Sequence, residues 1–162
     1  MTYLKLRHYS ASKTKAVDCD GLDPATWTKT SWVHPKPPAQ QVMWLSVGPA
    51  WIKWVKVEMP QWLPKYKHWR GVDVDMSKMI VIDTERKARA FNKKYGVVYE
   101  GWTLIDWSRV ASGKKCGLLL IDDFLRGMPL ESLYGDFYWA RSFDISSAVV
   151  WSKGCLRDCT LA

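Results

Sequence analysis

The chain has 162 residues, of which 48% are apolar and 25% charged, and this composition excludes an intrinsically disordered polypeptide. Its length suits one folded domain with a substantial hydrophobic core, so we expect a single domain over residues 1–162. The net charge of +8, from 24 Lys and Arg against 16 Asp and Glu, predicts attraction to nucleic acids, acidic proteins or anionic cofactors.

Period-two alternation predicts a first strand over residues 3–9, with His8 on its apolar side. Residues 19–41 hold four of the eight prolines and show little periodicity, which predicts a long loop. Loops of this length in a small domain often form binding loops or lids. A short buried strand that ends in a turn is predicted next, over residues 41–48.

A short helix is expected to begin at Pro49, with Trp51 and Trp54 on one face. Residues 71–83 then have the pattern of two strands joined by a turn near residues 75–78.

The second half of the chain contains the clearest helix signal, over residues 83–96, with a polar cap at its start and a glycine at its end. A shorter helix is predicted over residues 105–112, followed by a central strand over residues 116–122 and a last strand over residues 147–151. This order of elements favours a mixed α+β domain over an alternating parallel sheet.

Tryptophan is unusually frequent, with 11 residues. Because the N–H of a fully buried indole needs a hydrogen-bond partner, this number predicts that some indoles line a cleft. The basic residues form short scattered clusters and no long tail. Their distribution is compatible with nucleic-acid binding and, somewhat more readily, with an ordinary solvated surface.

No segment has the pattern of a signal peptide, and no window approaches the roughly 20 apolar residues of a membrane span. We therefore expect a cytoplasmic protein without a membrane partner. The cysteines lack the paired spacing of a zinc site, which predicts no metal centre and four free thiols: Cys19, Cys116, Cys155 and Cys159.

Polar residues at the ends of the predicted strands are candidates for a binding site. His8 and Ser10 share a face and could hold a hydroxyl-rich ligand, although a core imidazole bonded to the backbone is the commoner role of such a histidine. Ser46 is either a turn residue or a site residue. Trp51 and Trp54 are either core residues or the wall of a pocket in which a flat ring stacks.

Asp144 interrupts a run of aromatic and apolar residues over residues 137–151 that is expected to be buried. Its carboxylate should therefore lie at the rim of an apolar pocket. The pattern leaves two roles equally open, an ion pair with Arg141 or contact with a ligand. The common nucleophile-elbow, phosphate-loop, dinucleotide-binding and zinc-protease motifs are absent from the sequence.

Taken together, the motifs resemble those of a family of small proteins carried by phages and prophages. The matching segments run from end to end of the chain: LRHYS (6–10), MWLS (43–46), IDWSRVASGKKCGLLL (105–120) and FDISSAVVW (143–151). In the last motif Phe143 replaces the family's Trp and Ala148 replaces its Gly, and both changes keep the apolar character. The family in turn resembles the ADP-ribosyltransferase fold, which implies an α+β domain with a mixed split β-sheet and short flanking helices.

This resemblance implies an NAD-dependent mono-ADP-ribosyltransferase that modifies a host protein or nucleic acid in the host cytoplasm, as an anti-defence or host-takeover factor. In that fold a histidine near the first strand binds a ribose hydroxyl of NAD, aromatic groups hold the nicotinamide, and a late acid orients the ribose. The implied cofactor-binding residues are His8, Ser10, Trp44, Ser46, Trp51 and Trp54. The implied catalytic residues are Asp144 and Ser147, where Ser147 lies at the position that some members give to the acid.

Two alternatives accompany this interpretation. The first is a non-enzymatic protein whose basic, tryptophan-rich surface binds nucleic acid or blocks a host protein. The second is an RNA 2'-phosphotransferase, which also uses NAD but needs several arginines around its phosphate, whereas Arg7 is the single one near the histidine motif.

Overall fold

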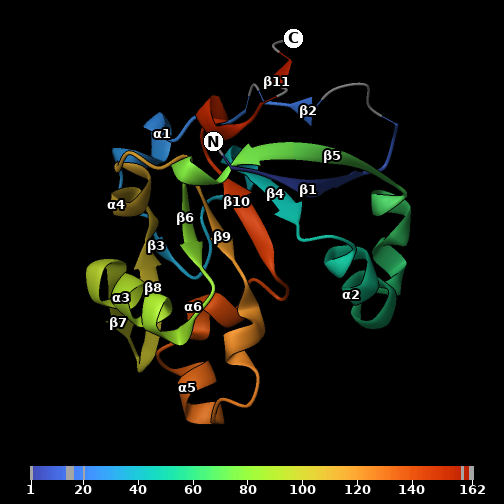
Figure 1. Ribbon diagram of the computed structural model, residues 1–162. Coiled ribbons are helices and arrows are strands. Elements are labelled where there is room, and N and C mark those ends of the chain that lie inside the picture. The colour runs from blue at the N-terminus through green and yellow to red at the C-terminus, as the bar shows by residue number, and fades with distance from the viewer. Residues whose placement is uncertain (1, 14–16, 20, 158, 161–162) are drawn as a thin grey trace.

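The computed structural model describes the chain except for residues 1, 14–16, 20, 158 and 161–162. It has an α+β architecture, with a mixed six-stranded sheet, a small antiparallel sheet and short helices (Figure 1). The predicted α+β class and the mixed sheet are therefore confirmed. Within the described residues, no helix is long and apolar enough to cross a membrane.

The large sheet contains the strands that the sequence pattern predicts most clearly. In spatial order they are β5 (His68–Asp75), β1 (Tyr3–Ser10), β4 (Met43–Ser46), β10 (Ser147–Val150), β9 (Gly117–Leu120) and β6 (Met79–Ile82). Neighbouring strands are antiparallel except for β6 and β9, which are parallel. Strands β9 and β10 are buried along their whole length, as expected for central strands.

Apolar residues cover both faces of this sheet, so the core has two parts. One part contains Leu118 of β9 together with the buried indoles of Trp107 and Trp139. The other part lies on the opposite face and contains Leu119. Successive residues of β9 thus alternate between the two parts, which is the period of two that defines a strand.

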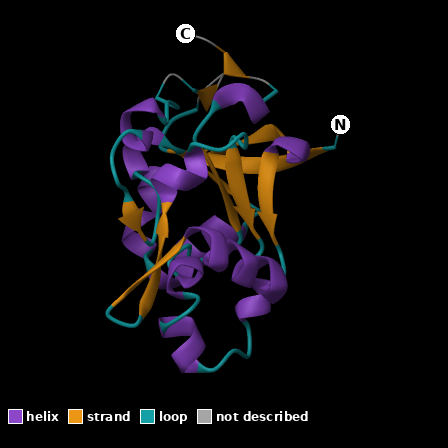
Figure 2. Cartoon of the chain, turned by 90° about the vertical axis from the view of Figure 1, so that its left-hand side faces the viewer, coloured by secondary structure: helices purple, strands orange, loops and turns teal. Residues whose placement is uncertain are grey.

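Short helices and the smaller sheets surround the large sheet. The α-helices are α1 (Ala25–Thr28), α2 (Ala50–Glu58), α3 (Glu85–Tyr95), α4 (Trp107–Ala111), α5 (Leu130–Tyr134) and α6 (Tyr138–Arg141). The 3-10 helices are η1 (Ala39–Gln41), η2 (Pro60–Tyr66), η3 (Met76–Lys78), η4 (Asp122–Leu125) and η5 (Lys153–Cys155). The small antiparallel sheet has the order β3 (Val33–His34), β8 (Trp102–Asp106) and β7 (Gly96–Tyr99), and a parallel pair is formed by β2 (Val17–Asp18) and β11 (Cys159–Thr160). The side that carries α3, α4 and the small antiparallel sheet is on the left in Figure 1 and faces the viewer in Figure 2.

The helix ends follow the signals in the sequence. Thr84 caps α3 by accepting a hydrogen bond from the backbone N–H three residues later, and Gly96 follows the last residue of the helix. Asp106 caps α4 by accepting a hydrogen bond from the N–H of Arg109. Pro49 precedes the first residue of α2. These local predictions are confirmed.

The β7–β8 hairpin and the helices α5 and α6 were not predicted. Residues 19–41, predicted as a long loop, contain α1, β3 and η1, so that prediction was wrong in part; elements of two to four residues are too short for a period to stand out. The hairpin turn places Glu100 and Gly101 at positive φ, 49° and 85°, which suits the right-handed twist of a two-residue hairpin. Glutamate is not a residue that signals such a turn. Helices α5 and α6 have five and four residues, which is too short for a helical period to stand out in the sequence.

Strand β1 separates from β4 partway along its length. It pairs with β5 at every residue from Tyr3 to Ser10, but these fully described strands show one pairing of β1 with β4, between Arg7 and Ser46. Beyond Arg7, β1 and β5 run away from β4 together, toward the right in Figure 1. A separation of the sheet therefore opens next to His8.

A projecting segment, which we call the arm, lies beside this separation. It consists of residues 50–70, which form α2, η2 and the beginning of β5, and it lies on the opposite side of the molecule from α3 (Figure 1). Trp51 and Trp54 stack in the arm with ring centroids 5.1 Å apart and an interplanar angle of 16°. Their predicted placement on one helix face is confirmed.

The cysteines depart from the expectation in one respect. Cys116 and Cys155 are free and buried, as predicted. Cys19, however, is disulfide-bonded, so the expectation of a free thiol was wrong there. A disulfide requires Cα atoms within about 7 Å, and spacing along the chain does not reveal which cysteines the fold brings that close. The side chain of Cys159 lies outside the described part of the structure.

Candidate functional site

A cleft of about 1010 Å³ lies where β1 separates from β4. Its walls come from the second half of β1, from β4, from the residues that lead into β10, from residues 32–42, which include parts of β3 and η1, and from the arm. Cofactor pockets in proteins enclose roughly 300–1,000 Å³. The cleft is therefore large enough for a dinucleotide-sized ligand.

The cleft brings together residues from distant parts of the sequence. Six of the eight predicted site residues line it: His8, Trp44, Ser46, Trp51, Asp144 and Ser147. Two are not among its lining residues. The hydroxyl of Ser10 donates a hydrogen bond to the carbonyl of Ser12 at 2.8 Å, and Trp54 stacks against Trp51.

His8 lies at the point where the two strands part. Its Nδ1 is 3.5 Å from the carbonyl oxygen of Trp44, and the contact is partly buried. If Nδ1 carries the proton, it donates to this carbonyl and Nε2 becomes an acceptor. The backbone contact expected of a core histidine is thus present, yet the same side chain also lines the cleft.

Tyr9, which the sequence analysis did not single out, is also among the lining residues, and its hydroxyl is buried. Its phenolic oxygen is buried and has no hydrogen-bond partner among the described residues. A buried hydroxyl without a partner costs about 1–3 kcal/mol.

The two serines have hydroxyls that are already engaged. Ser46 donates to the carbonyl of Gly48 and accepts from the N–H of Trp51, both at 3.0 Å, so it organises the turn into α2. Ser147 lies opposite Ser46 in the sheet, is buried, and donates to the carbonyl of Ile145 at 3.3 Å. Neither serine supplies a negative charge.

Asp144 supplies the carboxylate of the cleft. It lies in the loop before β10 with φ of 65°, a left-handed conformation that is uncommon outside glycine and that costs about 1–3 kcal/mol. Its Oδ2 is 3.7 Å from Nζ of Lys36, and both side chains are partly exposed. Arg141, the ion-pair partner considered from the sequence, instead donates through Nη2 to the hydroxyl of Tyr134 at 3.0 Å.

Lys36 could not be assigned to a site from the sequence because the loop over residues 19–41 has no periodicity. The one signal was the length of that loop, which predicted a binding loop or lid. Residues of its second half do line the cleft, including Trp32, His34 and Lys36. Arg7 is the second cation of the lining.

Aromatic rings form much of the remaining wall. Trp44 contacts Phe143 edge to face, with ring centroids 5.1 Å apart. From the arm, Trp51 lies edge to face with Tyr66 at 5.4 Å, and Trp62 also reaches the cleft. Four of the 11 tryptophans therefore line the cleft, as their number predicted: Trp32, Trp44, Trp51 and Trp62.

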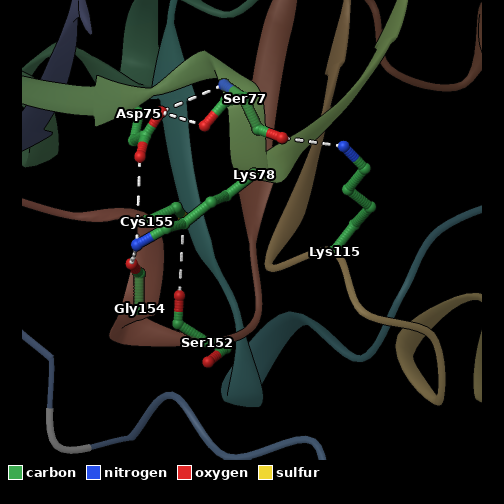
Figure 3. Close-up of polar contacts among 7 residues, drawn as sticks. All are labelled: Asp75, Ser77, Lys78, Lys115, Ser152, Gly154 and Cys155. Atoms are coloured by element: carbon green, nitrogen blue, oxygen red, sulfur yellow. Dashed lines mark hydrogen bonds and ion pairs between the residues drawn. The ribbon is translucent and has the colours of Figure 1, made fainter. Parts of the chain in front are cut away.

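A second polar cluster, away from the cleft, holds the far end of β5 (Figure 3). Asp75 is 2% exposed and accepts hydrogen bonds from the hydroxyl and the N–H of Ser77, at 2.7 and 3.0 Å. The Ser77 hydroxyl is the main reason why the pKa of Asp75 is lowered, with Lys78 contributing. Lys78 in turn donates to the carbonyl of Gly154 at 2.8 Å. This cluster ties η3 to the C-terminal segment, which is a structural role.

Cys155 belongs to the same structural region. Burial, and then the neighbouring thiol of Cys116, raises the pKa of Cys155 to about 12. A thiol with such a pKa stays protonated at neutral pH and is a poor nucleophile. Among the described residues, no group of three or more His, Cys, Asp or Glu side chains could hold a metal ion.

Comparison with models of protein families, with curated proteins and with solved structures finds no match to this chain. The geometry of the cleft therefore carries the functional argument.

Proposed function

We propose that the chain is a single ADP-ribosyltransferase-like domain that binds NAD in the cleft and transfers ADP-ribose to a macromolecule. One observation carries the proposal: six residues selected from separate sequence motifs meet in one cleft of suitable size. The separation of β1 from β4 supports it as well, because the fold implied by those motifs has a split sheet.

The lining suits NAD in its chemistry. Indole and phenyl faces can stack the nicotinamide and adenine rings. Arg7 and Lys36 can neutralise the diphosphate, and His8 offers a ring nitrogen for a ribose hydroxyl. NAD, when bound, supplies a nicotinamide–ribose bond that develops positive charge on the ribose as it breaks.

Asp144 is the residue suited to stabilise that charge, since a fixed carboxylate at the point of developing charge lowers the barrier. Its ion pair with Lys36 is partly exposed, and such pairs contribute only about 0–1 kcal/mol. Lys36 can therefore exchange Asp144 for a phosphate at little cost. With a ligand stacked on them, the aromatic walls would shield the reacting bond from water, which would compete with the acceptor.

The test is to measure NAD binding by calorimetry and label transfer from NAD to the components of a host lysate. Asp144→Asn preserves the shape of the side chain and removes its charge. We expect transfer to fall by about 100-fold or more, with NAD binding changed only a few-fold. Asp123→Asn is the matched control, because Asp123 is exposed and paired with Arg126 outside the cleft.

Full transfer by Asp144→Asn, or no NAD binding by the unmodified protein, would refute the proposal. His8→Ala should weaken NAD binding and transfer together, since His8 would contact bound and reacting ribose alike.

One observation favours a second candidate, in which the cleft is a binding scaffold without activity. Ser147 is buried, neutral and bonded to the backbone at the position where some proteins of the resembling fold have their acid. A phage protein of this kind would act by binding a host component. Binding of a partner with no label transfer under any acceptor conditions would support this candidate. Among the described lining residues Arg7 is the single arginine, so the RNA 2'-phosphotransferase alternative gains no support.

A further inference from the structure

The arm combines positive charge with aromatic side chains to a degree that the rest of the chain does not match. Within residues 50–70 the one carboxylate is Glu58, and four of the 11 tryptophans lie there. The cations of the arm number five: Lys53, Lys56, Lys65, Lys67 and Arg70.

These cations are available to a partner. None of the five forms an ion pair with a carboxylate in the described part of the chain. The four lysines are exposed. Unpaired cations on a surface attract polyanions through their summed field and release counterions when the polyanion binds.

The aromatic side chains of the arm run as a connected series from the arm into the cleft. Tyr66 contacts Trp51, which stacks on Trp54, which in turn lies 6.3 Å from Trp62. Three members of the series line the cleft: Tyr66 and Trp62 at its two ends, and Trp51. The wall of the cleft nearest the arm is therefore made of flat apolar rings.

Trp69 extends this surface along β5. The residue is 54% exposed, although a large indole would ordinarily be mostly covered. The guanidinium of Arg7 lies 4.1 Å from its ring centroid, so a cation and an indole face are presented together. Arg7 also lines the cleft, which makes the surface continuous from Trp69 to the cleft.

We propose that the arm and the adjoining cleft wall bind single-stranded nucleic acid. Phosphates would contact the lysines of the arm, and unpaired bases would stack on Trp69, which lies outside the cleft lining; the rings of the cleft wall next to the arm offer further stacking faces when no NAD is bound. A duplex fits less well, because its bases are already stacked and offer no free faces. An acidic protein would satisfy the charge but would leave the indoles without flat partners.

This inference does not depend on the proposed function. Nucleic acid can bind the arm whether or not NAD binds the cleft, and the two are measured with different probes. If both hold, the strand is the acceptor class for the transfer. The transfer would then replace the bond from ribose to nicotinamide by a bond from ribose to a nucleophilic atom of the strand. The electron pair of the broken bond would go to the ring nitrogen of nicotinamide. The proton of the acceptor atom would go to water.

The experiment uses the full chain and fluorescently labelled oligonucleotides of about 16 nucleotides, single-stranded or annealed to a complement, with anisotropy measured over a range of salt concentrations. We expect single-strand binding that weakens steeply as salt rises, because phosphate contacts release counterions. Quenching of tryptophan fluorescence should accompany binding, since bases would stack on the indoles.

Lys53→Glu combined with Lys56→Glu is the charge variant, and Arg86→Glu combined with Lys93→Glu is its control. Both pairs are exposed, lie on helices and change the net charge equally, but the control pair is on α3, across the molecule. We expect the arm variant to lose about tenfold or more in affinity and to show a shallower salt dependence. The control should lose no more than about threefold.

Trp69→Ala tests the stacking part of the proposal. Because Trp69 is exposed, this change should leave folding intact and weaken single-strand binding by about tenfold. Equal losses for the arm and control variants, equal affinity for the duplex, or an unchanged affinity of Trp69→Ala would overturn the inference. Absence of oligonucleotide binding at about 50 mM salt would overturn it as well.

Discussion

The arm and the surface of α3 are both rich in cations, but they differ in pairing: two of the α3 cations form ion pairs within the described residues, whereas Arg86, Lys93 and Lys94 of α3 form none. On α3, Arg89 pairs with Glu85 at 2.8 Å and with Asp136 at 3.2 Å, and Lys87 pairs with Asp83 at 2.7 Å. In the arm no cation has a carboxylate partner within the described residues. Charges that hold a helix in place are not free to bind a ligand, so charge alone does not identify a binding surface.

The aromatic residues show the same contrast. Phe91 of α3 is 5% exposed and contacts Trp107 and Trp139 in the main core. In the arm, Trp54 contacts other arm residues and the ring series leads to the cleft. Helix α3 is therefore part of the main core, whereas the ring contacts of Trp54 lie within the arm, so we expect the arm to tolerate aromatic truncation better.

The largest expected effect is on the free energy of unfolding, when an aromatic side chain of α3 and one of the arm are each truncated to alanine. Phe91→Ala should lower the free energy of unfolding by about 3–5 kcal/mol, because it leaves a cavity in the main core. Trp54→Ala should lower it by only about 1–2 kcal/mol, because this ring is half-buried in the arm. Urea denaturation followed by circular dichroism measures both values. Equal losses would mean that the arm is as integral to the core as α3.

The two ends of β5 offer a comparison that depends on pH. At one end of the strand Trp69 is exposed. At the other end the buried Asp75 accepts a hydrogen bond from Ser77 and forms an ion pair with Lys78. Because the pKa of Asp75 is lowered in the folded protein, its contribution to stability is fully present above its ordinary pKa of 3.8 and is lost as the pH falls below that value.

Asp75→Asn should therefore lower the urea midpoint at neutral pH and flatten the loss of stability below about pH 3.8, measured by urea titrations at several pH values. Trp69→Ala, at the other end of the strand, should leave the acid dependence unchanged. An acid dependence of Asp75→Asn identical to that of the unmodified protein would contradict the role given to this carboxylate.

The smallest expected effect separates paired from unpaired cations. Arg89→Ala removes hydrogen bonds to two carboxylates and should cost about 0.5–1 kcal/mol of stability. Lys53→Ala in the arm should stay within about 0.5 kcal/mol of the unmodified protein. Thermal unfolding at low and high salt distinguishes the two variants, because salt screens ion pairs and should reduce the loss of stability caused by Arg89→Ala. A larger loss at Lys53 would show that the arm's charges stabilise the fold.

Much of the fold followed from local patterns in the sequence. The alternation of apolar and polar residues predicted the strand that carries His8. The apolar run before Asp122 predicted the central strand β9. The cap signals at Thr84 and Asp106 located two helices because a side chain next to a helix end satisfies free backbone N–H groups. These features depend on neighbours within a few residues, which is the range that sequence patterns report.

The candidate site was predicted in part for the same reason. His8 and Ser46 stand near the ends of predicted strands, and strands of one sheet bring their ends together. Asp144 was selected because it interrupts an apolar run shortly before the last predicted strand. Lys36 and Tyr9 were missed, because their placement depends on how an irregular loop folds back and on where β1 leaves β4.

The sequence by itself determined the α+β class, the central strands, the capped helices and the excess of positive charge, since each follows from local spacing or composition. Only the tertiary structure decided which charges are paired and which are free, that Cys19 is disulfide-bonded, and that Asp144 lies near Lys36 and not against Arg141. The physical reason is that ion pairs, disulfides and cleft walls join residues far apart in the chain, and distance in space is set by packing of the whole domain.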